Sequence, residues 1–357
     1  MKVIKLDLKP NTQFHLGGNT PFLDSVLHTT DTIIRSDTLF SAIINIAAKI
    51  GAAQQLIDLF KEDAVSISSG FYMISVKDKN IYFFPRPTIP LSNDLEVKKI
   101  KKIKFVSPLV IQDYSFNDWF NNGNLINGSN WIATKEEFSE LFSVEKNNFD
   151  SFVKSNLSTT PDNIKFYQTQ NIPQVCVHQE TQEDSFYQNT NLFISDNRYI
   201  HPDLNINFYF LLKGELSQEL NQTLALLKDE NIGGQKSTGC GQIQDINIYD
   251  DDLFNTINTD NKYQMSLSLI SPDIKNNENN SLDEFSYYQT ILRGGRTTAL
   301  DGKLNDIRMI TEGAILNKNI TGNIPKLGES KEKQDYLRYG KAFYIPINKS
   351  YLKNDKL

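Results

Sequence analysis

Alternating apolar and polar residues at the N-terminus predict a β-strand, and the first long apolar run after it predicts a helix. Residues 2–10, KVIKLDLKP, interleave aliphatic side chains with lysines, and the proline ends the strand. Residues 35–51, RSDTLFSAIINIAAKIG, are apolar on nearly every side of a helix, so we expect this helix to be largely buried. Ser36 and Asp37 suit its N-cap and first turn, and Gly51 suits its end.

Further strand and helix patterns follow downstream. Residues 65–76, VSISSGFYMISV, and 81–90, IYFFPRPTIP, predict paired strands around the turn KDKN. Residues 205–212, NINFYFLL, predict another strand, and residues 215–234 predict an amphipathic helix with its leucines on one stripe. Residues 241–250, GQIQDINIYD, predict the last strand of this series. The predicted elements therefore run in the order strand, helix, strands, helix, strand. This is the order of a split βαβ, or ferredoxin-like, unit.

The remaining sequence divides into a weakly patterned insertion and a second block. Over residues 92–200, approximately, only short strand-like pieces are evident, which we interpret as an insertion or extended hairpin without a separate core. After a polar linker, residues 263–270, YQMSLSLI, alternate well, and two later segments are strand-like. We therefore predict two α+β domains, residues 1–250 and 260–357, with the insertion in the first.

Composition and charge limit the possible functions. The 357 residues are 39% hydrophobic, and no run approaches the ~18 apolar residues of a membrane span. The N-terminus lacks the apolar block of a secretory signal, and the two cysteines, Cys176 and Cys240, are far apart, so we expect a cytoplasmic protein without disulfides. Neither a metal nor a cofactor is expected from the motifs present. The net charge of −6 argues against general coating of nucleic acid, so any RNA binding must use a local groove.

The segment NIGGQKSTGCGQI, residues 231–243, holds four glycines and one lysine within nine residues. It is not a Walker phosphate loop, because Cys240 and Gly241 stand where that motif needs a lysine and a hydroxyl. It is not a dinucleotide loop either, because a helix precedes it and a strand follows it. One alternative is a helix C-cap and turn, for which Gly233 and Gly234 are suited. The lysine and hydroxyls of QKST favour the other alternative, contact with a sugar-phosphate chain.

The ordered motifs resemble one family of CRISPR proteins. A glycine-rich loop between the second helix and the last strand of a ferredoxin-like unit is similar to the loop of the RAMP superfamily. The segments IIRSDTLFSAI, SISSGF, YFFPRP and KKIKKIKFVS, followed by YQMSLSLISP, ILRGGRT, TEGAIL and YLRYGKAFYI, resemble successive blocks of one RAMP family. That family is subunit four of the type III-A CRISPR (Csm) complex, and the resemblance extends from the N-terminus to about residue 345.

The resemblance implies a fold, a function and a set of partners. The fold would be α+β, with two ferredoxin-like (RRM-like) domains and a long β-hairpin insertion, the thumb, in the first. The protein would be a non-catalytic RNA-binding subunit that holds the 5′ tag of the guide RNA (crRNA). It would abut the large polymerase-like subunit and contact a backbone RAMP subunit. By holding the tag, it would help the complex to distinguish self from non-self transcripts in antiviral defence.

The family's RNA-binding loop corresponds to residues 233–241 of this chain. The residues carried over by the resemblance are Gly233, Gly234, Gln235, Lys236, Ser237, Thr238, Gly239 and Gly241. Lys236 and the hydroxyls of Ser237 and Thr238 are expected to contact phosphates. Ser36 opens the first helix, whose positive N-terminal end would face the RNA backbone. Further candidates for RNA contact are Arg86, which stands between two prolines, and Arg293 and Arg296, which flank Gly294 and Gly295 and are expected to be exposed at a strand end.

An alternative interpretation is a RAMP endoribonuclease that processes guide RNA with a loop histidine as general acid or base. His15 and His28 lie in the loop after the first strand, and a histidine's pKa near neutrality suits that role. No companion base is fixed by spacing, so we expect no catalytic residue. The basic run over residues 98–104 has isoleucines at helical spacing and predicts either a solvated amphipathic helix or a surface against guide RNA or the large subunit.

Overall fold

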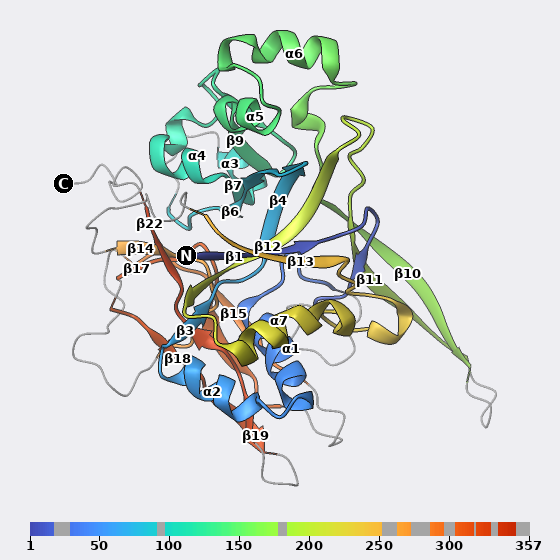
Figure 1. Cartoon of the computed structure of the whole chain (residues 1–357), viewed down its shortest axis with the longest axis vertical. Coiled ribbons are helices and arrows are strands. Elements are labelled where there is room, and N and C mark those ends of the chain that lie inside the picture. The colour runs from blue at the N-terminus through green and yellow to red at the C-terminus, as the bar shows by residue number, and fades with distance from the viewer. Residues whose placement is uncertain are drawn as a thin grey trace.

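The chain is organised around one antiparallel sheet, with helices on one side, a helical lobe on the other and a long hairpin at one end (Figure 1). The computed structural model describes residues 1–17, 29–90, 97–177, 184–251, 263–272, 286–295, 304–317, 319–329 and 335–347. Within these ranges no helix is long and apolar enough to cross a membrane.

The central sheet joins strands from both ends of the first 251 residues. The strands are β1 (Lys2–Asp7), β3 (Val65–Ile67), β4 (Phe71–Val76), β5 (Lys79–Tyr82), β12 (Leu204–Gly214) and β13 (Asp245–Asp250). Their order is β13-β1-β12-β4-β5, with antiparallel neighbours throughout, and β3 pairs with the far end of β12. In this register Ile4 lies opposite Phe210 on one side and Ile248 on the other. The first and last strands of the series are therefore direct neighbours.

Three helices, α1 (Ser36–Lys49), α2 (Ala53–Lys61) and α7 (Gln218–Glu230), lie together on one side of this sheet (Figure 1). The leucine stripe of α7, including Leu220 and Leu224, is buried, as its spacing predicts. The chain order β1, α1, β4, β12, α7, β13 confirms the predicted alternation of strands and helices. Helix α2 was not predicted.

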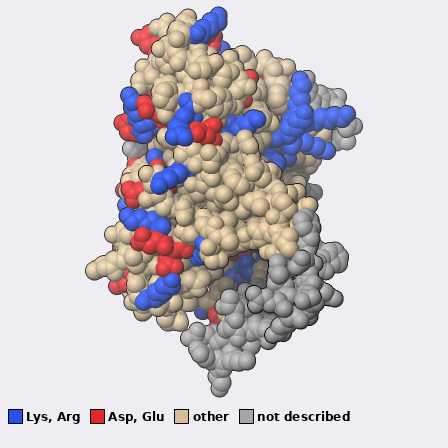
Figure 2. Space-filling model, turned by 90° about the vertical axis from the view of Figure 1, so that its right-hand side faces the viewer, with Lys and Arg blue, Asp and Glu red and all other residues tan. Residues whose placement is uncertain are grey.

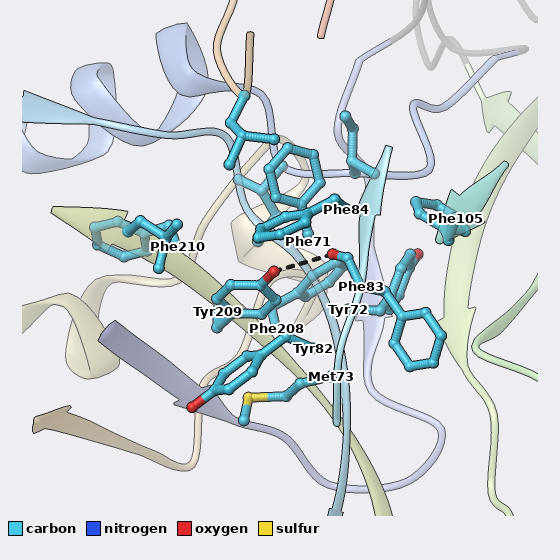
Figure 3. Packing of buried hydrophobic residues seen from close by; sticks show 14 of the residues in the cluster. Phe71, Tyr72, Met73, Tyr82, Phe83, Phe84, Phe105, Phe208, Tyr209 and Phe210 are labelled. Carbon is cyan, nitrogen blue, oxygen red and sulfur yellow. Dashed lines mark hydrogen bonds between the residues drawn. The ribbon is translucent and has the colours of Figure 1, made fainter. Parts of the chain in front are cut away.

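Aromatic side chains from the sheet and from the insertion form one continuous core (Figure 3). Tyr72 of β4 packs edge-on against Phe105 of the insertion, with ring centroids 5.1 Å apart. Tyr209 of β12 donates a hydrogen bond of 3.0 Å from its hydroxyl to the carbonyl oxygen of Phe83. Such a partner is needed because burying an unpaired hydroxyl costs free energy. The insertion therefore shares the core of the sheet.

The insertion contains more than the short strand-like pieces expected from its sequence. Between β5 and the hairpin, four short helices pack around a sheet of order β6-β7-β9-β8. The elements are β6 (Phe84–Pro85), α3 (Val97–Lys102), β7 (Phe105–Val106), α4 (Pro108–Asp113), η2 (Phe116–Asp118), β8 (Leu125–Asn127), β9 (Trp131–Thr134), α5 (Lys135–Leu141), η3 (Lys146–Asn148), α6 (Phe149–Asn156) and η4 (Pro161–Asn163). Apart from the helix predicted over the basic run, these helices were not predicted, because helices of at most eight residues are too short to show a clear helical period.

The predicted long hairpin follows this lobe. Strands β10 (Tyr167–Val177) and β11 (Asp184–Ile194) pair antiparallel along 11 residues each and extend away from the body of the molecule (Figure 1). At its base β11 also pairs with β2 (Gln13–Phe14). This pairing attaches the hairpin to the segment that follows β1.

The C-terminal residues add several small sheets. Their strands are β14 (Tyr263–Ser266), β15 (Thr290–Arg293), β16 (Ile307–Ile310), β17 (Ile315–Asn317), β18 (Gly322–Asn323), β19 (Lys326–Glu329), β20 (Asp335–Leu337), β21 (Gly340–Lys341) and β22 (Tyr344–Pro346). A three-stranded sheet has the order β17-β14-β22, and Tyr339 stacks on Phe40 of α1 with ring centroids 5.4 Å apart. The described residues of this region contain no helix, so a second ferredoxin-like domain stays a prediction.

Candidate nucleic-acid interface

The glycine-rich segment lies between α7 and β13, where the sequence pattern predicts it. Gln235 is left-handed, with φ of 54° and ψ of 35°, and Lys236–Thr238 then form the 3₁₀ turn η5. Gly239 and Gly241 return the chain toward β13 with φ of 86° and 81°. Glycine adopts positive φ without a steric penalty, whereas other residues are disfavoured there. The path of the chain therefore accounts for Gly239.

Two other glycines are required by contacts inside the protein. A Cβ atom on Gly233 would lie 2.6 Å from the carbonyl oxygen of His15, and one on Gly241 would lie 2.0 Å from that of Ile232. The amide of Gly241 donates to the carbonyl oxygen of Gln13 at 2.7 Å, which holds the loop against β2. The close approach that these glycines permit is thus to the protein's own backbone. Their contact with RNA stays a prediction.

Between these glycines the loop presents three consecutive amides. The N–H groups of Gln235, Lys236 and Ser237 have no acceptor within the parts of the chain that the structure describes. The next two amides close η5 by donating to the carbonyl oxygens of Gln235 and Lys236, at 3.1 and 3.0 Å. A left-handed residue followed by a right-handed turn directs successive amides into one concavity, which is a geometry that binds anions.

The side chains beside these amides are exposed. Lys236, Ser237 and Thr238 all face solvent. Desolvation lowers the pKa of Lys236, although the nearby carboxylate of Glu230 opposes this shift. The Thr238 hydroxyl donates to the carbonyl oxygen of Gln235 at 2.8 Å and so braces the turn. The loop therefore combines free amides, a lysine and the Ser237 hydroxyl, a set of donors that suits a phosphate group.

A layer of amide side chains supports the loop from the hairpin. Asn189 of β11 is buried and donates from Nδ2 to Gln235 Oε1 at 2.7 Å. Asn191 donates to Gln13 Oε1 at 3.3 Å and to Cys240 Sγ at 3.6 Å. Sequence reasoning missed these two asparagines. The insertion is rich in asparagine, and no spacing distinguishes the buried ones from those in surface loops.

His15 lies buried next to the loop rather than exposed at its surface. Its Nδ1 donates to the carbonyl oxygen of Thr190 at 3.0 Å, since a carbonyl oxygen can only accept. A Cβ atom on Gly234 would lie 3.1 Å from the imidazole ring. A general acid or base must reach the group with which it exchanges a proton. His15 is placed instead to support the loop, and His28 lies outside the described residues.

Ser36 is fully buried, so its predicted contact with RNA is not supported by its position. Its amide donates to Ser69 Oγ at 2.8 Å, and its Oγ accepts from the amide of Leu269 at 3.1 Å. The N-cap of α1 is Arg35, one residue before the one predicted. The serine joins the start of α1 to the C-terminal strands, an arrangement that local sequence does not reveal.

The predicted arginine contacts are also partly buried. Arg86 is half-buried, and burial lowers the pKa of its guanidinium. Arg293 was expected at an exposed strand end, but it is 8% exposed and donates to Asp37 at 2.9 Å and to Asp31 at 3.2 Å. That expectation of exposure was wrong, and the guanidinium is occupied by carboxylates. Arg296 lies outside the described residues.

Arg293 belongs to a buried set of three arginines and three carboxylates, which we call the charge cluster. Arg35 donates to Asp31 at 2.7 Å and to Glu312 at 2.6 Å, and Arg338 donates to Asp37 at 2.6 Å. The members are Asp31, Arg35, Asp37, Arg293, Glu312 and Arg338. Equal numbers of each sign let the set be buried without net charge. The cluster joins α1 to the C-terminal strands.

The basic run over residues 98–104 is largely helical, with α3 ending at Lys102. Its isoleucines, Ile100 and Ile103, are buried, and its lysines are exposed. Figure 2 shows the side of the molecule that lies at the right in Figure 1. The largest group of Lys and Arg side chains lies at its upper right, and others are interspersed with acidic side chains at the left. Positive charge is therefore locally concentrated on a chain whose net charge is −6. Local concentration is what RNA binding by an acidic protein requires.

Comparisons with known proteins agree with the ordered motifs of the sequence. Residues 259–347 match the family model of the CRISPR Csm4 C-terminal domain. The chain is 26% identical over 367 residues to the CRISPR system Cms protein Csm4 of Methanocaldococcus jannaschii, covering 93% of this chain and 90% of that protein. Its fold is similar to a chain of the Csm3-Csm4 subcomplex in the type III-A CRISPR-Cas interference complex, with a TM-score of 0.63, 22% identity, and 98% and 100% of the two chains covered.

Proposed function

We propose that the chain is a Csm4 protein, a non-catalytic, RNA-binding subunit of a type III-A CRISPR interference complex, which the match to the Csm4 C-terminal family model and the similarity to a Csm4 protein over 93% of the chain support. In this proposal it holds the 5′ tag of the guide RNA with the glycine-rich loop. It contacts a backbone RAMP subunit, as the similar chain from a Csm3-Csm4 subcomplex suggests, and it abuts the large polymerase-like subunit. The complex would use the held tag to distinguish self from non-self transcripts in the cytoplasm.

We further propose that the chain contains two ferredoxin-like domains. The sheet order β13-β1-β12-β4, with α1 and α7 on one side, supports a ferredoxin-like RAMP domain that ends near residue 250. Hairpin β10–β11 corresponds to the thumb inserted in that domain. We propose that residues 260–357 form the second domain, which the match to the Csm4 C-terminal family model supports.

The observation that carries the RNA-binding proposal is the row of free amides at Gln235, Lys236 and Ser237. Backbone amides can donate to phosphate oxygens, and the Lys236 ammonium and Ser237 hydroxyl add two further donors at the same place. All these groups contact phosphate or sugar rather than base edges. Such contacts fix the register of a nucleic acid without reading its sequence. We therefore propose that the loop grips the tag irrespective of its bases.

The position of His15 favours binding over cleavage. Its imidazole is buried, and Nδ1 is used by the Thr190 carbonyl oxygen. Proton transfer to or from a ribose would require the loop above it to open. We propose no catalytic residue in this chain.

The double substitution Lys236→Ala with Ser237→Ala tests the loop. It removes one charge-assisted contact and one hydroxyl donor, which together contribute about 1–3 kcal/mol at an exposed site. Retention of guide RNA by the assembled complex is expected to weaken by about 10- to 100-fold. Retention is measured over a range of salt concentrations, because loss of one phosphate contact should also reduce the salt dependence by about 0.7 in slope.

A matched control is Lys154→Ala with Ser151→Ala, which makes the same chemical change at exposed positions of α6. This variant should retain guide RNA as the unsubstituted complex does. If both double variants retain RNA equally at every salt concentration, the loop is not the phosphate contact and the proposal fails.

A further inference from the structure

Gln235 occupies a backbone conformation that its side chain does not favour. Its φ of 54° and ψ of 35° are left-handed, a region that residues with a Cβ atom rarely adopt. The residue stands at the first of the three free amides, so its conformation decides whether they point into one concavity. If Gln235 moved to the right-handed region, its peptide units would rotate and the three N–H groups would diverge. Something must hold it.

The contact that holds Gln235 comes from the hairpin, 46 residues earlier in the chain. Asn189 Nδ2 donates to Gln235 Oε1 at 2.7 Å and to Asn191 Oδ1 at 3.1 Å. The Asn189 side chain is 0% exposed, so it is fixed in position. Its Oδ1 is buried and has no partner in the part of the chain that the structure describes. A buried amide with one end unsatisfied is costly, which indicates that the orientation is set by the two bonds of Nδ2.

We infer that Asn189 is a positioning residue for phosphate binding: by fixing the Gln235 side chain it keeps the amides of Gln235, Lys236 and Ser237 convergent. The inference rests on the proposed function of the loop. Asn189 itself is fully buried and does not touch the RNA. Through Asn189, in the middle of β11, the hairpin controls the shape of the anion site, so displacement of this part of β11 lowers the affinity of the loop for the tag.

Two substitutions at Gln235 separate conformation from side-chain contact. Gln235→Ala and Gln235→Gly both delete the bond to Asn189, but only glycine adopts the left-handed conformation freely. Gln235 is only half-buried and is not part of the hydrophobic core, so neither variant threatens the core. The probe is the guide RNA extracted from the purified complex, rebound to complexes reassembled with each full-length variant. Gln235→Ala should weaken rebinding about tenfold, and Gln235→Gly should bind within about threefold of the unsubstituted protein.

A second pair of variants tests whether Asn189 acts through Gln235. Asn189→Ala should weaken rebinding about tenfold when position 235 is glutamine and should have no further effect when Gln235→Gly is also present. The control is Gln188→Ala, the neighbouring and exposed residue of β11, which should bind normally. A merely structural role of Asn189 would not be rescued by glycine at position 235.

The outcomes are distinct from those of the loop test. If Gln235→Ala and Gln235→Gly bind equally, or if Asn189→Ala weakens binding to the same extent in both backgrounds, the positioning role is overturned. If instead Lys236→Ala with Ser237→Ala leaves rebinding unchanged, the loop is not the RNA site and the proposed function itself fails. Rescue by glycine together with weakening by Lys236→Ala and Ser237→Ala supports both.

Discussion

Replacing Asp37 by asparagine is the sharpest test of how the two ends of the chain are held together. Asp37 accepts hydrogen bonds from Arg293 at 2.9 and 3.0 Å and from Arg338 at 2.6 Å, and its side chain is 0% exposed. The substitution keeps the shape of the side chain and removes one negative charge. The charge cluster then holds three arginines against two carboxylates, Asp31 and Glu312, so one buried positive charge is left without compensation.

The expected cost follows from that uncompensated charge. Breaking a buried ion pair by removing one partner typically costs about 3–5 kcal/mol, because the remaining charge stays desolvated. Burial alone would raise the pKa of Asp37, but Arg293 and Arg338 outweigh it and hold the pKa well below the usual range. A depressed pKa means that ionised Asp37 stabilises the folded chain above about pH 4, and that this contribution is lost as pH falls toward the folded pKa. The asparagine variant should lack that part of the acid dependence.

The assay is urea unfolding of the purified full-length chain, followed by the fluorescence of the buried tryptophans Trp119 and Trp131. The control is Asp63→Asn, which also breaks a link to the C-terminal strands, the ion pair with Lys341 at 2.8 Å. Asp63 is 61% exposed, so its loss should cost at most about 1 kcal/mol. Equal costs for Asp37→Asn and Asp63→Asn would refute the reasoning.

A double variant tests the charge balance directly. Combining Asp37→Asn with Arg338→Met leaves two arginines and two carboxylates, so the cluster is neutral again. The cost of the double variant should be smaller than the sum of the two single costs by about 1–3 kcal/mol. An additive result would mean that the arginines and Asp37 do not interact in the way their geometry indicates.

Two further predictions concern a glycine and a buried carboxyl. Gly241→Ala should destabilise the chain by about 2 kcal/mol in urea unfolding, because φ is 81° and the new Cβ would meet the backbone of Ile232. The control Gly123→Ala, with open space around the new Cβ, should change the unfolding free energy little. Equal effects of the two substitutions would contradict this prediction. Burial raises the pKa of Glu137 from 4.5 to about 7, so the folded chain keeps a proton that the unfolded chain loses, and stability falls as pH rises through that window. The free energy of unfolding of Glu137→Gln, relative to that of the unsubstituted chain, should therefore rise by about 3 kcal/mol between pH 4.5 and pH 8. A difference in unfolding free energy that does not change with pH would contradict this prediction.

Long, regularly patterned elements could be predicted from the sequence because their periodicity is a local property. The strand at the N-terminus, helix α1, strand β12 and helix α7 all lie where their apolar spacing places them. Helix α2 was missed because it is short and buries only two residues, Leu56 and Phe60. The other helices of the lobe between β5 and the hairpin, α4 to α6, were missed for the same reason, since each is short and buries few residues.

The location of the candidate site was predictable, but the roles of many candidate residues were not. Arg293 and Asp37 are separated by 256 residues, and Ser36 and Leu269 by 233. No spacing in the sequence indicates that such residues meet. An arginine beside glycines at a strand end therefore suggested an exposed RNA contact, whereas tertiary packing places it in a neutral buried cluster. Contacts of this kind follow from the fold rather than from any local pattern.

The glycines of the loop satisfy two physical requirements, and this changes how substitutions there should be interpreted. Gly233 and Gly241 lie against the backbone of His15 and Ile232, so a side chain at either position displaces the loop itself. A Cβ atom on Gly239 would make only an ordinary contact with Gln242 Nε2 at 3.9 Å, so this glycine is required only by its φ of 86°. Loss of RNA binding on replacing any of these glycines would report a deformed loop. Direct contact with phosphate must be tested between them, at Lys236 and Ser237, where the free amides and exposed side chains lie.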